Sequence, residues 1–199
     1  MSTQRVTFLT PEQYLEIERE AEFRSEYLNG EVVAMSGGTP NHARIALNTA
    51  MRLAEQLAGH RCEAFGGDLL RLYSIEHKVF TYPDVLVTCG PHQFLDARGD
   101  TITDATVIVE VLSPSTEAHD RGFKFAQYQQ LDSLEEYVLV SQIEPRVESF
   151  RRQMNGKWLY SDVRGIAAIC RFDSVDCEVP LSEIYYQVAF DSEPPLPRV

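Results

Sequence analysis

The chain has 199 residues, of which 44% are hydrophobic and 24% are charged, values typical of one globular domain and not of a disordered or fibrous protein. Its net charge of −12 differs from the basic surplus of proteins that bind nucleic acid mainly through phosphate contacts. Nucleic acid is then either not the main ligand, or is contacted briefly and locally, or is attracted by cations held in an acidic pocket.

The sequence predicts neither a membrane protein nor a secreted one. No apolar run approaches the roughly 20 residues of a membrane span, and the first ten residues lack the apolar region of a signal peptide. We therefore expect a cytoplasmic protein. The four cysteines, Cys62, Cys89, Cys170 and Cys177, are far apart in the chain and include no CxxC pair. We expect buried free thiols, with no zinc site and no disulfide framework.

The N-terminal third predicts two helices and a hairpin. In "TPEQYLEIEREA" Thr10 is a suitable N-cap, so we expect a helix over residues 11 to about 21. In "SEYLNGEVVAMSGG" the pair Asn29-Gly30 is typical of a two-residue type I′ turn between strands. "TPNHARIALNTAMRLAEQLAGH" has apolar residues at helical spacing and predicts a long amphipathic helix that stops near Gly59.

The rest of the chain alternates strands with one more helix. Strand-like runs are "RCEAF", "DLLRLYS", "YPDVLVT", "TVIVEVLS", "EYVLVS", "RVESFRR" and "KWLYSD". The segment "CGPHQFLDARGDTITDA" is typical of a loop, and a helix is expected over residues 116 to 131. We expect a single α/β domain over residues 1–190, with a mixed, curved sheet, followed by a Pro-rich tail over residues 191–199.

Two of the predicted strands each contain one acid among apolar residues. Asp84 follows Pro83 in "YPDVLVT", and Glu110 lies 26 residues later in "TVIVEVLS". A buried carboxylate is costly unless it has a partner or binds a metal. If the two strands are neighbours, both carboxylates reach one edge of the sheet. Carboxylate oxygens with a backbone carbonyl and water are what Mg²⁺ prefers. Taken separately, Asp84 also fits a turn residue and Glu110 an arginine partner.

A third group follows in the next predicted helix. Asp120, Lys124 and Tyr128 stand at i, i+4 and i+8 and so share one face of that helix. An exposed Asp120–Lys124 pair would contribute only a few tenths of a kcal/mol. If the helix begins beside the end of the Glu110 strand, Lys124 points back toward the two carboxylates. There it could orient or deprotonate a metal-activated water, or neutralise a phosphate.

This constellation resembles the PD-(D/E)XK nuclease superfamily, in which Pro-Asp on one strand is followed by Glu-x-Lys on the next. Here Pro83-Asp84 and Glu110 match, but Leu112 stands where the pattern has lysine. A lysine migrated to the following helix is known in variants of the superfamily, and Lys124 is the candidate. More closely, the chain resembles the Uma-type family of restriction endonucleases. The segments "SEYLNGEVVAMSG", "NHA", "YPDVLV", "VEVLSPST", "DRGFKFAQY" and "EYVLVS" match in order.

The resemblance implies a restriction-endonuclease-like core, a mixed sheet of four or five strands flanked by helices, with Mg²⁺ as cofactor. It also implies roles for further residues. Glu26 aligns with a family acid that assists the metal site, although a solvated residue at a strand start is the plainer interpretation. His42 aligns with a family histidine that could face the site, or could simply pack near the start of its helix. Asp68 is a candidate acid behind the metal ligands.

We therefore expect a Mg²⁺-dependent endodeoxyribonuclease, for which Mn²⁺ can substitute. Asp84, Glu110 and the carbonyl of Val111 would hold the metal, and Lys124 and Glu26 would assist. A homodimer is expected, because a nuclease this small needs two copies to cut both strands. The rival hypothesis is a catalytically degenerate member that acts as a dimeric interaction or regulatory module; the leucine at 112 and the net charge of −12 favour it. A weaker third possibility is a hydrolase of small nucleotides.

Overall fold

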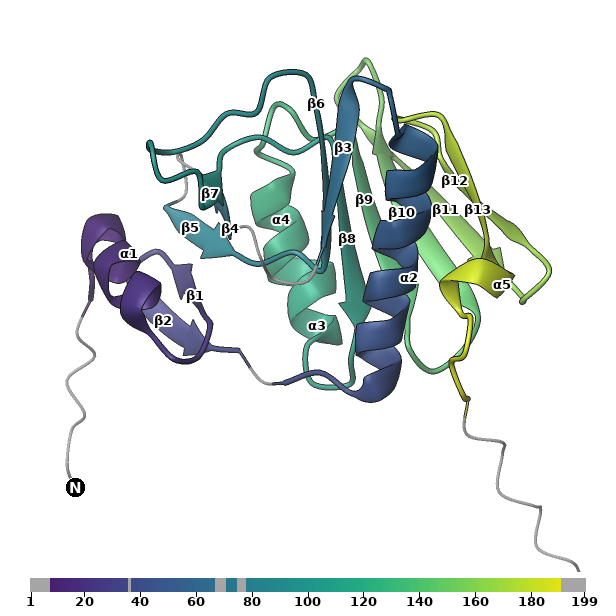
Figure 1. Cartoon of the computed structure of the whole chain (residues 1–199), viewed down its shortest axis with the longest axis horizontal. Coiled ribbons are helices and arrows are strands. Elements are labelled where there is room, and N and C mark those ends of the chain that lie inside the picture. Colours follow the sequence, from purple (N-terminus) through teal and green to yellow (C-terminus); the bar gives the residue numbers. More distant parts are fainter. Residues whose placement is uncertain (1–7, 36, 67–70, 75–77, 191–199) are drawn as a thin grey trace, which may run out of the picture.

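A six-stranded mixed sheet forms the centre of the molecule. The computed structural model describes residues 8–35, 37–66, 71–74 and 78–190 (Figure 1). The strand order is β11 (Trp158–Arg164), β10 (Arg146–Arg152), β9 (Glu136–Ser141), β8 (Val107–Leu112), β6 (Val85–Cys89) and β3 (Cys62–Gly66). β8 and β9 run parallel, and the other neighbours run antiparallel. The mixed sheet is as expected, with six strands where the resemblance implied four or five.

A second, smaller sheet lies beside the first. Its order is β2 (Glu31–Ala34), β1 (Ser25–Leu28), β5 (Val79–Thr81), β4 (Arg71–Ser74) and β7 (Thr101–Ile102). A separate hairpin is formed by β12 (Ile169–Phe172) and β13 (Cys177–Pro180). Sequence periodicity did not indicate β5, β7, β12 or β13, because each is a run of only two to four residues.

Helices cover both faces of the central sheet (Figure 1). The helices of the described residues are α1 (Pro11–Glu20), α2 (Pro40–Leu57), α3 (Glu117–His119), the π-helix η1 (Asp120–Lys124), α4 (Phe125–Tyr128) and α5 (Leu181–Ile184). Of these, α1 packs on the smaller sheet through Tyr14 and Leu15. α2 packs on one face through Ile45, Leu53 and Leu57. The continuous segment α3–η1–α4 lies on the other face, where Tyr128 contributes to a second apolar cluster. Successive β8 side chains therefore alternate between two buried layers.

The N-terminal predictions are confirmed at the level of single residues. Thr10 caps α1 and forms a capping box with Gln13. Asn29 and Gly30 connect β1 to β2 with φ values of 50° and 108°, both in the left-handed region that a type I′ turn requires. Gly59, with φ of 80°, follows the end of α2. The expected helix over residues 116–131 begins at Glu117 and ends at Tyr128, with a π-helical turn inside it.

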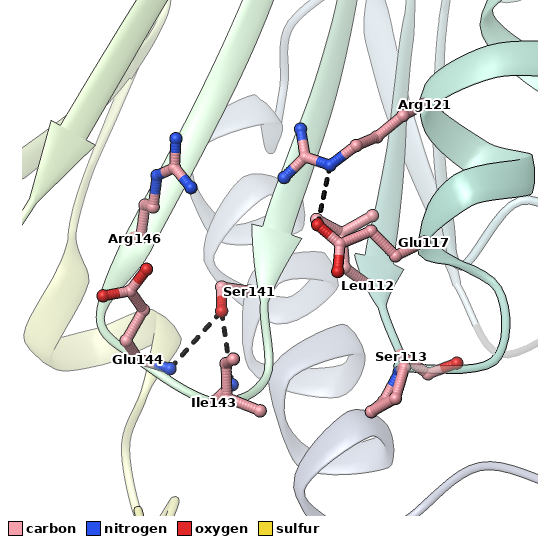
Figure 2. Close-up of a pocket in the computed structure, with 9 residues that line it drawn as sticks. Leu112, Ser113, Glu117, Arg121, Ser141, Ile143, Glu144 and Arg146 are labelled. Atoms are coloured by element: carbon pink, nitrogen blue, oxygen red, sulfur yellow. Dashed lines mark hydrogen bonds and ion pairs between the residues drawn. The ribbon is translucent and has the colours of Figure 1, made fainter.

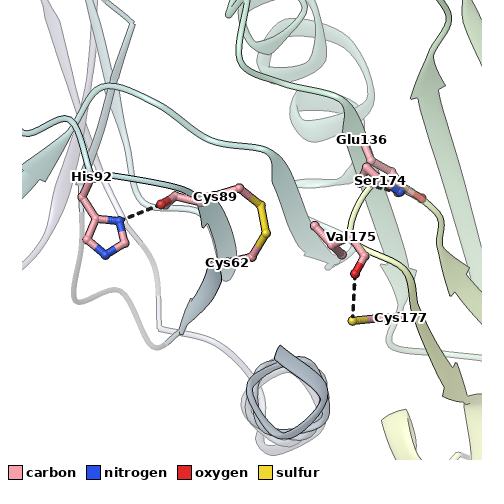
Figure 3. Close-up of a disulfide and its surroundings, with 8 residues drawn as sticks. Cys62, Cys89, His92, Glu136, Ser174, Val175 and Cys177 are labelled. Atoms are coloured by element: carbon pink, nitrogen blue, oxygen red, sulfur yellow. Dashed lines mark hydrogen bonds between the residues drawn. A yellow bond between two sulfur atoms is a disulfide. The ribbon is translucent and has the colours of Figure 1, made fainter. Parts of the chain in front are cut away.

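The expectation of four free cysteines was wrong. Cys62 and Cys89 are directly opposite each other on β3 and β6, with a Cα–Cα distance of 4.0 Å, and they form a disulfide (Figure 3). No local sequence signal indicated this pair, because the two cysteines are 27 positions apart in the chain and come together only when the sheet forms. Cys170 and Cys177 are free and buried, as expected. The predicted tail over residues 191–199 lies outside the described residues.

None of the helices in the described ranges is long and apolar enough to cross a membrane. The cytoplasmic location stays a prediction.

Candidate functional site

Pairing of β6 with β8 brings the two predicted acids together. Val85 is opposite Val109 in this antiparallel pair, so Asp84 lies opposite Glu110 at the end of the ladder. At this end of the ladder a side chain serves as the hydrogen-bond acceptor in place of a backbone carbonyl: Asp84 Oδ2 accepts a hydrogen bond of 2.7 Å from the Val111 amide. The Pro83-Asp84 step thus lies immediately before β6 and fixes the aspartate against β8.

Glu110 faces the layer that contains the α3–η1–α4 segment. Its neighbours at alternate positions, Ile108 and Leu112, belong to the apolar cluster on that face. The glutamate is 3% exposed, and its Oε1 accepts hydrogen bonds of 3.1 Å from Lys124 Nζ and 3.0 Å from the Tyr128 hydroxyl. A single acid in an apolar strand is therefore satisfied by two polar groups from one helical segment.

Lys124 is the centre of a buried ionic cluster. Its Nζ lies 3.0 Å from Glu26 Oε1, 3.1 Å from Glu110 Oε1 and 3.4 Å from Asp120 Oδ1. Each of these side chains is less than a tenth exposed. The predicted return of Lys124 toward the carboxylates is thus seen in the structure. So is the shared face of Asp120, Lys124 and Tyr128.

The cluster draws its acids from both sheets. Glu26 lies on β1, which pairs with β5, and the Tyr82 amide that follows β5 donates to Glu26 Oε1 at 3.5 Å. The Tyr82 hydroxyl donates to Glu18 and accepts from Arg71. This network holds the residue two positions before Asp84, and so it links the N-terminal hairpin to the start of β6.

Glu110 and Lys124 each shift the pKa of the other. Burial raises the pKa of Glu110 well above its ordinary value, and Lys124 opposes that rise. The negative charges of Asp84, Asp120 and Glu26 raise it further. Burial disfavours the charged form of Lys124, yet the surrounding carboxylates outweigh burial and hold the pKa of the lysine well above its ordinary value. The surrounding carboxylates therefore favour the protonated form of Lys124.

Two histidines border the acids. His42, in the first turn of α2, places its Nε2 3.3 Å from Asp84 Oδ2, so the histidine singled out by the family resemblance does face the site. His119 was not singled out; its Nε2 lies 3.9 Å from Glu26 Oε2, and its ring stacks on Phe123. A lone histidine one position from Asp120 carries no distinctive sequence signal. Asp68, the remaining candidate, lies outside the described residues.

Leu112 explains why the lysine is not in its usual position. The side chain is 5% exposed and belongs to the apolar cluster beneath the helical segment. A lysine at 112 would bury its ammonium among apolar groups. The segment "SPST" leads instead directly from β8 into α3, and the helix supplies the cation 14 residues after Glu110.

The described residues hold no group of three or more His, Cys, Asp and Glu side chains placed to bind a metal ion. The site nevertheless gathers four carboxyl groups near one lysine. Those of Glu26, Glu110 and Asp120 lie within 3.4 Å of Lys124 Nζ, and Asp84 lies opposite Glu110 on the neighbouring strand. Hard oxygen donors of this kind are the ligands that a divalent cation such as Mg²⁺ prefers.

A separate hollow of about 80 Å³ opens at the carboxyl ends of β8 and β9 (Figure 2). Arg121 and Arg146 enter it from the helical segment and from β10. Both guanidinium groups are bound to Glu148, and Arg121 also binds Glu117. Because these charges are balanced within the protein, we assign no ligand to the hollow.

The chain was then compared with known proteins. A family model described as "Uma2: Putative restriction endonuclease" matches residues 11–169. Two proteins of Synechocystis sp. are similar over most of their length. The uncharacterized protein slr1290 is 34% identical over 92% of this chain and 94% of its own, and the uncharacterized protein sll1609 is 32% identical over 82% and 92%.

The fold has a counterpart among solved structures. The crystal structure of a putative nuclease belonging to DUF820 from Anabaena variabilis superposes with a TM-score of 0.72 at 17% identity, covering 89% of this chain and 97% of that one. At this identity the likeness concerns the fold alone, and it agrees with the mixed sheet and flanking helices described above. The family match covers well over half of the chain and includes each of the acids of the site and Lys124. The protein belongs to the Uma2 family of restriction-endonuclease-like proteins.

Proposed function

We propose that this protein is a metal-dependent endonuclease that hydrolyses phosphodiester bonds in DNA, with Mg²⁺ as its cofactor. The observation that carries the proposal is the buried contact of Lys124 with Glu110, on the strand next to Asp84. It supplies the two acids and the cation of the nuclease pattern in a chain of the Uma2 family. The lysine reaches them from a helix.

The donor set fits the proposed metal. Asp84, Glu110 and the carbonyl of Val111 would hold Mg²⁺, which commonly binds proteins through only one or two carboxylates and keeps several waters. The Val111 amide orients Asp84, and a carboxylate can still accept at both oxygens. Bound at this position, the ion would lower the pKa of a water ligand and polarise the scissile phosphate.

Lys124 acts in this proposal as a fixed positive charge. Its raised pKa disfavours the neutral amine that a general base would need. A protonated lysine can instead orient the attacking water and stabilise negative charge that develops on the phosphate. Glu26 is a second carboxylate in contact with the ammonium besides Glu110, and so it positions Lys124.

The test is cleavage of supercoiled plasmid and of single-stranded DNA with Mg²⁺ or Mn²⁺, by the wild type and by Asp84→Asn. Asparagine keeps an oxygen for the Val111 amide but loses the charge, so activity should fall about 100-fold or more while folding persists. Asp104→Asn is the matched control. Asp104 is buried and Asp84 nearly so, and the Asp104 carboxylate likewise accepts a backbone hydrogen bond, 3.0 Å from the Gln93 amide.

Equal cleavage by the wild type and Asp84→Asn would contradict the proposed site, and so would no cleavage at any concentration of either ion. Parallel reactions with RNA and with small nucleotides determine the substrate class. Cleavage of small nucleotides alone would replace the endonuclease by a nucleotide hydrolase.

A second function, a non-catalytic interaction module, is favoured by one observation. Lys124 already neutralises part of the charge on Glu110 and Glu26, so the cluster has internal compensation without a metal. Calorimetric titration with Mn²⁺ separates the two functions. Heat of binding in the wild type that disappears in Asp84→Asn supports the nuclease. No heat in either protein supports the module.

A further inference from the structure

The outer edge of β11 is a long backbone surface that no strand of the described residues covers. All seven residues of β11 pair with β10 without a bulge, and the strand contains no proline. Proteins usually protect such edges with short strands, prolines, bulges or a covering helix. The opposite edge strand, β3, is shorter, with five residues against seven.

The hydrogen bonds at the two ends of the hairpin show which residues point outward. The Gln153 amide donates to the Lys157 carbonyl, and the Gly165 amide donates to the Pro145 carbonyl. In an antiparallel pair, hydrogen-bonded positions alternate with non-bonded ones. Positions 159, 161 and 163 therefore direct their amides and carbonyls toward β10. The amides and carbonyls of residues 158, 160, 162 and 164 point to the free edge.

We propose that β11 pairs with β11 of a second copy, antiparallel and centred on Ser161, so that two central sheets join into one of twelve strands. In this register residue 160 is opposite residue 162 of the second copy, and 158 is opposite 164. All of these carry outward backbone groups, so every pair can exchange two hydrogen bonds. Strand addition of this kind obtains its affinity mainly from the backbone.

The side chains of β11 are complementary to themselves in this register. Tyr160 is opposite Asp162 of the second copy, and the ring of Trp158 is opposite the Arg164 guanidinium, a pair that aromatic stacking favours. On the other face Leu159 is opposite Val163. A two-fold axis at residue 162 would place two Asp162 carboxylates against each other, and an axis at residue 160 would shorten the paired segment. Ser161 is the centre that aligns all seven residues with no like charges opposed.

Exposed apolar side chains flank both ends of β11. Met154, in the turn before the strand, is fully exposed, and Ile166 and Ile169, after it, are 47% and 51% exposed. The same two-fold axis brings the turn at residues 153–156 of one copy alongside residues 166–169 of the other. The interface therefore extends beyond the backbone pairing with an apolar contact at each end.

A cysteine at the axis tests the register directly. Two residues at position 161 would form a non-hydrogen-bonded pair with Cα atoms about 4.5 Å apart, within disulfide range. Positions 159 of the two copies would be separated by about 14 Å along the strands. Under mild oxidation Ser161→Cys should give a covalent dimer, and the control Leu159→Cys, at a position that is also exposed, should not. Wild type has no accessible thiol for this reaction, since Cys170 and Cys177 are buried.

Charge at position 160 provides a second test by sedimentation equilibrium. Tyr160→Asp would place two pairs of like charges opposite each other across the axis and should weaken the dimer about tenfold or more. In Tyr160→Lys the lysine would be opposite Asp162 of the second copy, so the dimer should persist. Both variants lose the tyrosine hydroxyl bound to Glu148, and their melting temperatures report on the fold. Wild type at the mass of one chain up to its solubility limit would overturn the proposal. Equal crosslinking at 159 and 161 would also overturn it.

Discussion

Lys124 Nζ lies 3.1 Å from Glu110 Oε1, although a strand end, a turn and the start of a helix separate the two residues along the chain. The nuclease pattern takes its acid and its lysine from one strand, two positions apart. Here the strand position of the lysine is filled by Leu112, which belongs to the apolar layer under the helix. Lys124 therefore reaches Glu110 from the helical segment that covers the sheet, and not from a strand of the sheet itself.

Lys124→Met should abolish metal-dependent cleavage and also destabilise the fold. It leaves the carboxylates of Glu26, Glu110 and Asp120 buried without their common cation, which costs about 3–5 kcal/mol for a broken buried pair. Protonation relieves the repulsion, so the loss measured by urea unfolding should shrink between pH 7 and pH 5. Lys157→Met, at an exposed lysine, is the control. An equal loss of stability at both pH values would contradict the ionic cluster.

Tyr128→Phe should show whether the Tyr128 hydroxyl positions Glu110 or the side chain only fills space in the core. The tyrosine hydroxyl lies 3.0 Å from both Glu110 Oε1 and Thr81 Oγ1, and its loss should cost about 1 kcal/mol and reduce cleavage. Tyr137→Phe removes a buried hydroxyl that donates to the Asp120 carbonyl and does not touch Glu110. We expect similar stability losses but a larger drop in kcat for Tyr128→Phe. Equal kcat values would assign Tyr128 to packing alone.

The ion pairs of Asp100 should make the free energy of unfolding depend on pH in the acid range. The Arg19 guanidinium, with Arg71 behind it, holds the pKa of Asp100 well below its ordinary value in the folded state. A depressed folded pKa contributes stability that is present above the unfolded pKa of about 3.9 and is lost as pH falls toward the folded value. Asp100→Asn should therefore be less stable than wild type at pH 6, and the difference should shrink progressively as the pH falls below about 4. A difference that stays constant across that window would contradict the linkage.

The Cys62–Cys89 disulfide predicts how many thiols of the protein can react before and after reduction. Denatured protein without reductant should react with two equivalents of a thiol reagent, from Cys170 and Cys177, and with four after reduction. In native protein burial raises the pKa of Cys170 to about 12, so that thiol should be inert. Replacing Cys62 and Cys89 by serine should cost about 3 kcal/mol, from the loop entropy of the 27-residue separation. Four reactive thiols without reductant would contradict the bridge.

Local signals predicted the elements that carry the site. A capped helix start, an Asn-Gly turn and two apolar strands with one acid each are properties of short segments, and each was found where the sequence indicated it. The contact of Lys124 with Glu110 followed from helical spacing once the helix was assumed to begin at the strand end. Family resemblance added Glu26 and His42, whose side chains lie in and beside the cluster.

What the sequence did not predict depends on pairing between distant segments. Cys62 meets Cys89 only because β3 and β6 are neighbours, and His119 approaches Glu26 only because β1 lies against the helical segment. Glu18, Tyr82 and Arg71 form a polar network across three elements, and no periodicity relates them. Short strands such as β7 owe their conformation to their neighbours and carry no pattern of their own.

The π-helical turn at η1 makes chain length in this region as important as residue type. Its wider turn holds one more residue than an α-helical turn would, and the residues that contact Glu110 lie at its end and just beyond it. Removing one residue from 121–123 would convert this turn into a regular α-helical turn and leave the residues downstream, Tyr128 among them, on nearly the same face. The same deletion would bring Asp120 and Lys124, which contact each other across the π-turn, from four residues apart to three. In Uma2 relatives, a one-residue gap at this point would therefore mark a change in the Asp120–Lys124 pair and not in the contact of Tyr128 with Glu110.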